Sequence, residues 1–290
     1  MGVLGWDGPL TADAPVGVLV ASALVRGVGR LRGAVGMVEA QKDDAIHQVR
    51  VSCRRLRSDL KLFRKLPAGD WAGELRSELA ALAQACGEAR DLEVIAGLVR
   101  ETANSEDDEE HVETILTTLT IGLDRAAARS AEIVLGESTA ELLETLEAVA
   151  AAPDLKPAAG KPCGEVLPKL LDAANLKFGQ AANKLKPWTP DDDWHEVRLL
   201  AKRVRYAAST SASVLGEEAK ATATQAAKYQ ELLGQHQDHC AAADALTAMA
   251  ADAAAQDDPE LSFTLGRLTE RHRAARKPLR EEFLSLYHRP

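Results

Sequence analysis

A short pattern of histidine and arginine occurs twice in this chain, and it limits the possible folds more than any other feature. The copies are His47-x-x-Arg50-x-x-x-Arg54-Arg55-x-Arg57 and His195-x-x-Arg198-x-x-x-Lys202-Arg203-x-Arg205, 148 positions apart. A second match, CGEARDLEV at 86–94 and LGQHQDHCA at 233–241, follows at a separation of 147. Two matches in the same order predict a duplicated helical unit of about 145 residues.

The duplication suggests how the chain is organised. The stretch AAPDLKPAAGKPCGE at 151–165 holds three prolines and two glycines, which favour a linker. We therefore expect one domain over 1–290, with a first helical repeat at 11–150 and a second at 166–289. The two repeats should form similar bundles related by a pseudo-twofold axis.

The composition favours an all-α fold. Aromatic residues make up only 4% of the chain, while Ala, Leu, Glu and Arg recur in long stretches with little alternation. The start MGVLGWDGPLTADAPVG lacks the basic and apolar regions of a signal peptide, and no apolar run is long enough to span a membrane. The four cysteines are far apart and form no C-x-x-C pair. We expect a soluble protein of the reducing cytoplasm.

Each copy of the pattern predicts a helix with two adjacent stripes. A helix turns about 100° per residue, so one stripe collects the cations His47, Arg50, Arg54, Arg57, Lys61 and Arg64. The neighbouring stripe collects Val49, Cys53, Leu56, Leu60 and Phe63, which can be buried. In the second copy His195, Arg198, Lys202 and Arg205 lie beside Val197, Ala201, Val204 and Ala208. The second cation row is shorter, because Ser209 takes the place of Lys61.

Like charges one turn apart repel, so each row destabilises its own helix by a few tenths of a kcal/mol per pair. Solvation of the row, or pairing with the acids that give the chain a net charge of −9, would offset a single row. Two rows at the same spacing favour a shared ligand instead. Arginine predominates, and its planar donor fork matches phosphate oxygens. The rows therefore predict an extended polyanion as the ligand.

The stretch from His47 to Phe63, the stretch HEVRLLAKRVRYA at 195–207 and the Gly-x-x-[Arg/Gln]-Asp segments together resemble the CHAD family, the conserved-histidine α-helical domain. The resemblance covers about residues 11–289. It implies two four-helix-type bundles around a basic central groove or pore that binds inorganic polyphosphate. Such binding would place the protein on polyphosphate stores or granules. The binding residues it implies, together with the two further cations of the first stripe, are His47, Arg50, Arg54, Arg55, Arg57, Lys61, Arg64, His195, Arg198, Lys202, Arg203 and Arg205.

Two departures from the family pattern, Gln237 and the Ser209 that replaces a lysine, both concern the second repeat. Gln237 stands where the first repeat has Arg90, so the second face should bind more weakly. Arg55 and Arg203 point about 80° away from their stripes. Either they contact the ligand, or they pair with acids of the Gly-x-x-[Arg/Gln]-Asp segments, Asp91 and Asp238.

Other cations and histidines leave alternatives open. Six further cations either belong to the binding surface or lie on ordinary salt-bridged helix faces, and the sequence favours neither alternative. They are Arg125, Arg129, Arg273, Arg276, Lys277 and Arg280. His47 and His195 can be structural imidazoles or phosphate donors that strengthen on protonation. The segment HQDHC offers only His236 and His239 as a metal-ligand pair at i, i+3, so no intrinsic metal site is expected. Divalent cations could still arrive as counterions of the polyanion.

Three other functions are less favoured. No P-loop, nucleophile elbow or H-E-x-x-H motif indicates an enzyme, and the E-x-E-x-K signature of the triphosphate tunnel domains that accompany some family members is absent. Phosphate contacts alone would give some non-specific affinity for nucleic acid. The acidic balance of the chain disfavours this function, as does the lack of aromatic side chains near the rows, because Phe63 is on the buried stripe and only Tyr206 is close. A scaffold that docks an acidic protein partner is the remaining alternative. We expect binding of polyphosphate without catalysis and without a cofactor.

Overall fold

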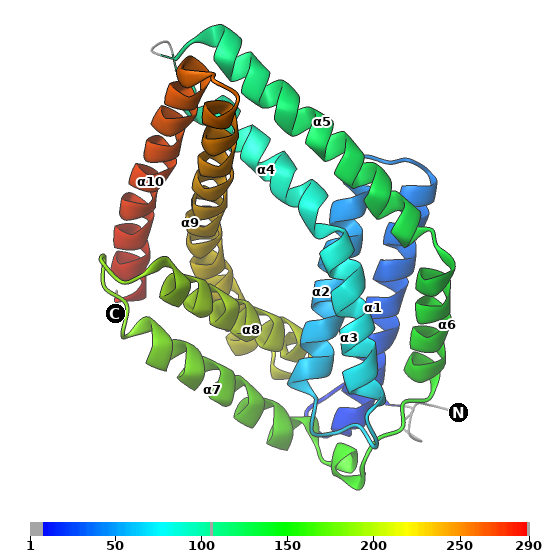
Figure 1. Cartoon of the computed structure of the whole chain (residues 1–290). Helices are drawn as coiled ribbons and strands as arrows, with labels where there is room; N and C mark the ends of the chain where they lie inside the picture. Colours follow the sequence, from blue (N-terminus) through cyan, green and yellow to red (C-terminus); the bar gives the residue numbers. More distant parts are fainter. Residues whose placement is uncertain (1–7, 105–106, 289–290) are drawn as a thin grey trace. The chain divides into compact units, whose positions relative to one another are not determined.

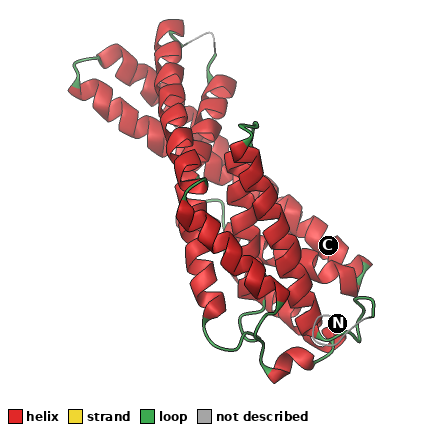
Figure 2. Ribbon diagram, turned by 90° about the vertical axis from the view of Figure 1, so that its right-hand side faces the viewer, coloured by secondary structure: helices red, strands yellow, loops and turns green. Residues whose placement is uncertain are grey.

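The computed structural model describes residues 8–104 and 107–288. Within these ranges it contains ten α-helices, one short 3-10 helix and no strand (Figures 1 and 2). The elements are α1 Val16–Glu39, α2 Ala45–Leu62, α3 Trp71–Ala85, α4 Gly87–Thr102, α5 Glu109–Val134, α6 Glu137–Ala151, η2 Pro157–Gly160, α7 Cys163–Ala182, α8 Asp191–Leu215, α9 Glu217–Ala255 and α10 Pro259–Tyr287. The expected all-α fold is confirmed.

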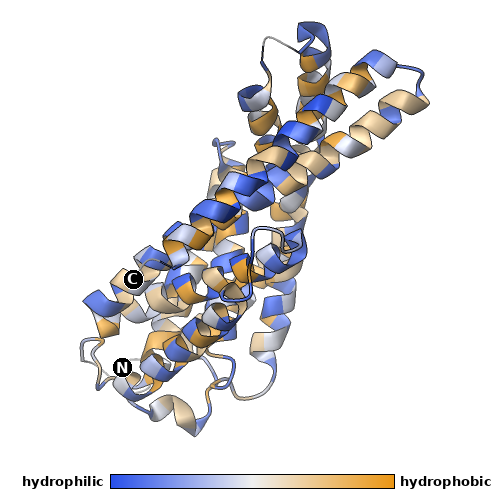
Figure 3. Cartoon of the chain, turned by 90° about the vertical axis from the view of Figure 1, so that its left-hand side faces the viewer, coloured by the Kyte–Doolittle hydropathy of each residue, from blue (hydrophilic) through white to orange (hydrophobic). Residues whose placement is uncertain are grey.

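The duplication and the central groove stay predictions. The first residues of the N-terminal stretch, 1–7, and the end of the second predicted repeat, 289–290, lie outside the described ranges. Along the described helices, hydrophobic and hydrophilic stretches alternate, as amphipathic helices require (Figure 3). No described helix combines the length and the apolar character needed to cross a membrane.

The chain forms two compact units, each made of segments far apart in the sequence. The first unit comprises the chain up to Gly87 together with Ala127–Gly179 and Lys202–Ala226. The second comprises Glu88–Ala126, Gln180–Ala201 and the chain from Ala227 onward. Helix α8 therefore contributes its first half to the second unit and its second half to the first. This division decides which of the predicted cations belong to the same unit.

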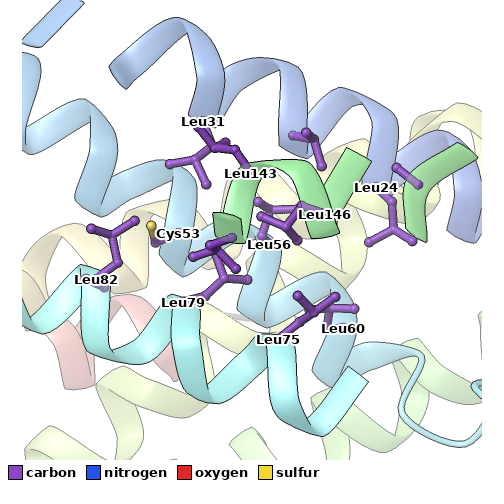
Figure 4. Packing of buried hydrophobic residues seen from close by; sticks show 14 of the residues in the cluster. Leu24, Leu31, Cys53, Leu56, Leu60, Leu75, Leu79, Leu82, Leu143 and Leu146 are labelled. Atoms are coloured by element: carbon purple, nitrogen blue, oxygen red, sulfur yellow. The ribbon is translucent and has the colours of Figure 1, made fainter. Parts of the chain in front are cut away.

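Four helices build the core of the first unit. Helix α1 packs against α2 and α6, and α3 packs against α2 and α6 (Figure 1). Leu31, Leu56, Leu79 and Leu146 are among the fully buried side chains where these helices meet (Figure 4). Burying such a side chain contributes about 1.5–3 kcal/mol, so this cluster holds α2 firmly in its rotation. The rotation of α2 in turn sets the direction of its cations.

The proline-containing segment at 151–165, which we predicted as a linker, packs onto the first unit. The backbone N–H of Ala68 donates to Asp154 O (3.0 Å), and that of Lys156 donates to Leu66 O (2.8 Å). At its other end, the backbone N–H of Cys163 donates to Ala14 O (2.8 Å). Because its backbone groups are paired on both sides, this segment has little of the freedom of a solvated linker.

The second unit has an aliphatic and an aromatic core. Ile95, Val99, Ile115 and Leu268 belong to the aliphatic part, which also includes residues of α9. In the aromatic part, Phe283 lies edge-on to Trp194, with ring centroids 5.7 Å apart, and edge-on to Tyr229 at 5.6 Å. Trp194 is buried directly before His195, so this packing fixes the start of the second cation row.

Candidate functional site

The apolar stripes predicted for α2 and α8 are buried. On α2, Val49, Cys53 and Leu56 are inaccessible, and in Figure 4 Cys53 and Leu56 lie among the leucines of α1, α3 and α6. On α8, Val197 and Val204 are buried as well. Since a helix is rigid, burial of one stripe directs the adjacent stripe of cations to the edge of the core. This part of the prediction is confirmed.

The cations of α2 are packed at that edge. His47, Arg50, Arg54, Arg57 and Lys61 are all partly buried. Long basic side chains in such positions cover apolar surface with their stems while their charged ends reach solvent. Only Arg64, two residues past the end of the helix, is exposed. The stripe is therefore a constrained surface of the first unit.

Arg50 crosses from α2 to the junction of α3 and α4. Its Nη1 donates a hydrogen bond to the carbonyl oxygen of Ala83 (3.3 Å). A Cβ atom at Gly87 would lie only 2.7 Å from this Nη1, so glycine leaves the space that the guanidinium occupies. This contact gives a physical reason for the glycine of the Gly-x-x-Arg-Asp segment. At Gly234, the corresponding glycine, an added Cβ would meet no heavy atom within 4 Å among the described residues.

Lys61 lies at the centre of a group of cations that we call the Lys61 cluster: Arg57, Lys61, Arg64, Arg76 and Arg203. Burial is the largest cause that lowers the pKa of Lys61, and the four arginines lower it further, Arg203 most strongly. The cluster draws on α2, α3 and α8, and all its members belong to the first unit. Cations of both copies of the sequence pattern therefore meet within one unit.

Two members of the Lys61 cluster have buried donors with no described partner. The Nε atoms of Arg57 and Arg76 are inaccessible and make no hydrogen bond within residues 8–104 and 107–288. Burying a donor without a partner costs free energy, so the cluster combines electrostatic repulsion with incomplete hydrogen bonding. Both costs decrease when an anion with several oxygens binds.

Arg76 could not be singled out from the sequence. It belongs to α3, outside both copies of the pattern, and it directly follows the buried Leu75. An arginine next to the apolar stripe of an amphipathic helix was the only available signal. That signal is weak, because it does not show which helix the arginine will face.

Arg55 lies in a different environment from the cations of the α2 stripe, as its position at offset 8 predicts. Its charge acts on Asp59, one turn later on α2, and on Arg30 of α1. Asp59 is buried, which raises its pKa, and it accepts a hydrogen bond from Thr210 Oγ1 (2.7 Å). The acid whose pKa Arg55 affects is thus Asp59, on the same helix. The pairing of Arg55 and Arg203 with Asp91 and Asp238 stays a prediction.

The second row divides between the two units. Lys202, Arg203 and Arg205 belong to the first unit, and Lys202 is only 9% exposed. His195 and Arg198 belong to the second unit. There, the His195 Nδ1 and Gln237 Oε1 atoms are 2.5 Å apart, which makes the imidazole the donor and the amide oxygen the acceptor. Gln237, the departure from the family pattern, therefore fixes the orientation of His195.

Three of the additional cations that the sequence suggested form ion pairs in the second unit. Arg276 and Arg280 both bind the carboxylate of Asp191, with Arg276 at 2.5 Å, and Arg273 binds Glu270 at 2.6 Å. Arg280 also lies over the ring of Trp194, 5.3 Å from its centroid. These contacts correspond to the salt-bridged alternative. Arg125, Arg129 and Lys277 are exposed.

A group of potential metal ligands lies beside these arginines. Ligand atoms of Asp191, His236 and Cys240 are all within 4.8 Å of one another. This trio could not be predicted from spacing, because Asp191 is far from the HQDHC segment in sequence. His236 Nε2 accepts a hydrogen bond from Arg280 Nε (2.9 Å), and burial, with Arg280 next, lowers the His236 pKa to about 4. Two guanidinium groups on the carboxylate and one on the imidazole disfavour a metal cation here.

Comparisons with known proteins agree on the family and the fold. The CHAD domain family model matches residues 23–247. The solved structure of PptA from Streptomyces chartreusis superposes with a TM-score of 0.77 and 22% identity, covering 95% of this chain and all of that one. The crystal structure of the CHAD domain from the plant Ricinus communis gives a TM-score of 0.79 and 21% identity, covering 98% and 96% of the two chains.

The uncharacterized proteins MT2285 and Rv2226 of Mycobacterium tuberculosis, from strains CDC 1551 and H37Rv, are also similar. Each is 29% identical to this chain over 259 residues, which is 84% of this chain. The match spans 48% of their length, so the chain covers about half of these relatives.

Proposed function

This chain belongs to the CHAD domain family, and we propose on that premise that it binds inorganic polyphosphate without cleaving it. Polyphosphate binding is a known property of the family, which supports a polyphosphate-related role. The finer proposal concerns the residues. It assigns binding to the cation rows of α2 and α8, His47 to Arg64 and His195 to Arg205, and adds Arg76 of α3.

The Lys61 cluster is the observation that carries the proposal. Its four arginines lower the pKa of Lys61, and two of them have buried Nε donors with no described partner. A ligand that relieves both costs must be an anion with many oxygens. Phosphate groups in series fit best, because each arginine can donate two hydrogen bonds to one phosphate and the row repeats about once per helical turn.

Nucleic acid fits the same surface less well. Proteins that bind single strands without sequence preference usually stack bases on aromatic side chains. Phe63 is 3% exposed and packed in the core, and Tyr206 is only partly exposed. The net charge of −9 also repels a wide polyanion such as a nucleic-acid duplex more than it repels a narrow polyphosphate chain. An acidic protein partner, bound as by a scaffold, is the second alternative.

Binding without cleavage agrees with the groups around Lys61. The strongest electrostatic influences on this lysine are cations, which bind phosphate oxygens. Enzymes that transfer phosphoryl groups also use carboxylates that hold metal ions or position a nucleophile. Divalent cations remain expected as counterions of the bound chain, at a polyphosphate store or granule in the cytoplasm.

The decisive test is titration calorimetry with polyphosphates of graded length at several salt concentrations. Removing two charges of the Lys61 cluster, in Lys61→Gln with Arg203→Gln, should weaken binding about 100-fold and make its salt dependence shallower by about 1–2 in the log-log slope. The matched control, Arg32→Gln with Lys169→Gln, removes two exposed charges of the first unit that pair with Glu147 and Glu165.

Two results would overturn the proposal. The first is equal affinity of the cluster variant and the wild type, with both folded by circular dichroism. The second is competition in which long polyphosphate fails to displace single-stranded RNA at equal phosphate concentration, which would favour nucleic acid. A phosphatase activity that remained after removal of contaminants would refute binding without cleavage.

A further inference from the structure

A buried hydrogen bond joins the two helices that carry the cation rows. Thr210 Oγ1 of α8 donates to Asp59 Oδ1 of α2 at 2.7 Å. Only 4% of Asp59 and 6% of Thr210 are exposed, and both residues belong to the first unit. Within residues 8–104 and 107–288, the Asp59 carboxylate has no other hydrogen-bond partner. Any other placement of α8 would leave this buried carboxylate unpaired, which costs free energy.

An apolar contact one turn away supports the same packing. Leu62, one turn after Asp59, packs against a buried cluster that contains Ala207, one turn before Thr210. At the 148-residue separation of the two sequence copies, Asp59 corresponds to Ala207 and Thr210 to Leu62. The equivalent pair of positions is therefore apolar, and apolar contacts are not directional. The hydrogen bond supplies the direction, because its two oxygen atoms must meet at a defined distance and angle.

The faces on which the two helices meet also carry one arginine from each sequence copy. Arg203 precedes Ala207 by four residues and Thr210 by seven, so all three lie on one face of α8. Arg55 precedes Asp59 by four residues and shares its face of α2. The hydrogen bond therefore sets the directions of these two corresponding arginines together. The neighbouring cations of the second half of α8 follow, because a helix is rigid over a few turns.

We propose that Asp59 and Thr210 are a positioning pair, which holds α8 against α2 so that cations of both sequence copies bind one long polyphosphate chain. Neither side chain touches the ligand in this arrangement, because their hydroxyl and carboxylate groups are buried and bonded to each other. The inference rests on the proposed function, since it requires that polyphosphate binds cations of both helices. It adds that the contact between the helices determines the preference for chain length.

The preference for chain length follows from the spacing of the cations. Those of one row recur about every 5.4 Å along the helix, so neighbouring cations of α2 can hold a short anion such as tripolyphosphate. A long chain extends past this row and gains further contacts only where Lys202, Arg203 and Arg205 are held beside it. When α8 loosens from α2, long chains lose contacts and short ones keep theirs.

The test compares two variants of the full chain by calorimetry with long-chain polyphosphate and with tripolyphosphate. Thr210→Val removes the hydroxyl at nearly unchanged volume, whereas Thr210→Ser keeps it. Thr210→Val should bind the long chain about 10-fold more weakly, with a change of less than about twofold for tripolyphosphate. The slope of log affinity against log salt concentration for the long chain should become shallower by about 1–2. Thr210→Ser should bind both anions as the wild type does.

Thr139→Val is the matched control. Thr139 is also a buried threonine of the first unit, and its Oγ1 donates to Ile133 O at 2.9 Å. It belongs to α6, which carries neither row, so this variant should lose stability without losing affinity for either anion. The proposal would be overturned by an equal loss of long-chain affinity in Thr139→Val and Thr210→Val, or by a loss in Thr210→Ser as large as that in Thr210→Val.

A measurement without ligand separates the positioning of α8 from polyphosphate binding. The native cysteines are buried, so spin labels can be attached to Lys65→Cys, just beyond α2, and to Ser213→Cys of α8, both exposed positions. Pulsed electron paramagnetic resonance should give a narrow distance distribution with Thr210 or Thr210→Ser and a broad one with Thr210→Val.

The two kinds of failure are then distinguishable. A broad distribution in Thr210→Val, with no polyphosphate binding by the wild type, would refute the proposed function and leave the pair only its role in holding α8 on α2. Tight polyphosphate binding by the wild type, with the same distribution and the same chain-length preference in Thr210→Val, would refute the positioning pair and leave the function standing.

Discussion

Replacing Gly87 by alanine separates binding from stability. The new methyl group would lie 2.7 Å from Arg50 Nη1, closer than packed atoms approach, so the guanidinium must move. The atom that moves is the end of a flexible side chain, and the move breaks the hydrogen bond to Ala83 O at 3.3 Å. That bond contributes about 0.5–1.5 kcal/mol.

The net effect on stability should be small. Alanine is favoured over glycine by up to about 1 kcal/mol within a helix, and by less at the first position, where Gly87 begins α4. The gain and the loss nearly cancel, so the free energy of unfolding should change by less than about 1 kcal/mol. Arg50, however, would be displaced from its place in the α2 stripe. Losing one charge-assisted contact should weaken polyphosphate binding about 10-fold.

Gly234→Ala is the matched control. Gly234 occupies the corresponding position of the second sequence copy, inside α9, where an added Cβ has open space among the described residues. This variant should gain up to about 1 kcal/mol of stability with unchanged affinity. Urea unfolding and calorimetry with polyphosphate would measure both quantities. If the two alanine variants bound polyphosphate equally well, the role of Gly87 in holding Arg50 in the site would be refuted.

Three further predictions address other parts of the structure. Arg76→Gln should weaken polyphosphate binding about 10-fold in calorimetry with little change in stability, because its Nε has no described partner to lose. Thr210→Val should cost about 1–3 kcal/mol in urea unfolding, because it removes the hydrogen bond to the buried carboxylate of Asp59. Burial lowers the pKa of both His236 and His272 to about 4 in the folded protein, whereas the pKa of an unfolded histidine is about 6.5. As the pH falls, the unfolded state therefore takes up protons first. The free energy of unfolding should decrease by about 2 kcal/mol per histidine between pH 7 and pH 5.

Each of these predictions has a contrary outcome. Unchanged affinity of a folded Arg76→Gln protein would remove α3 from the binding surface. If the free energy of unfolding of Thr210→Val lay within about 0.5 kcal/mol of the wild-type value, water would be shown to replace the lost hydrogen bond to the Asp59 carboxylate. For the histidines, the free energy of unfolding at pH 7 and that at pH 5 should differ by about 4 kcal/mol less in the double variant His236→Gln with His272→Gln than in the wild type. The same difference in both proteins would assign the acid sensitivity to other groups.

The stripes of α2 and α8 were predictable because they depend only on the helix itself. Residues three, four and seven positions apart share a face, so Val49, Cys53 and Leu56 define a core face from spacing alone. The cations beside them follow from the same periodicity. Arg55 could be placed away from its stripe for the same reason, although its acidic neighbour Asp59 was overlooked even though it is on the same helix.

The partners across helices could not be predicted in this way. Arg76 joins Lys61, and Asp191 joins Arg276 and Arg280, only after distant parts of the chain have packed. Arg76 and Arg276 are both arginines on amphipathic helices, yet one faces other cations and the other faces a carboxylate. No local spacing distinguishes them, because the difference depends on which helix packs beside each.

The sequence by itself therefore determined the helices, their buried faces and the two rows of cations, since these follow from the period of the α-helix and from the residue types. The tertiary structure decided which cations lie together and which are neutralised, since charge interactions depend on distances between segments that are remote in sequence. It brought Arg203 of the second copy close enough to lower the pKa of Lys61 of the first, and it paired Arg276 and Arg280 with Asp191. The space at Gly87 likewise depends on the packing of α2 beside the start of α4.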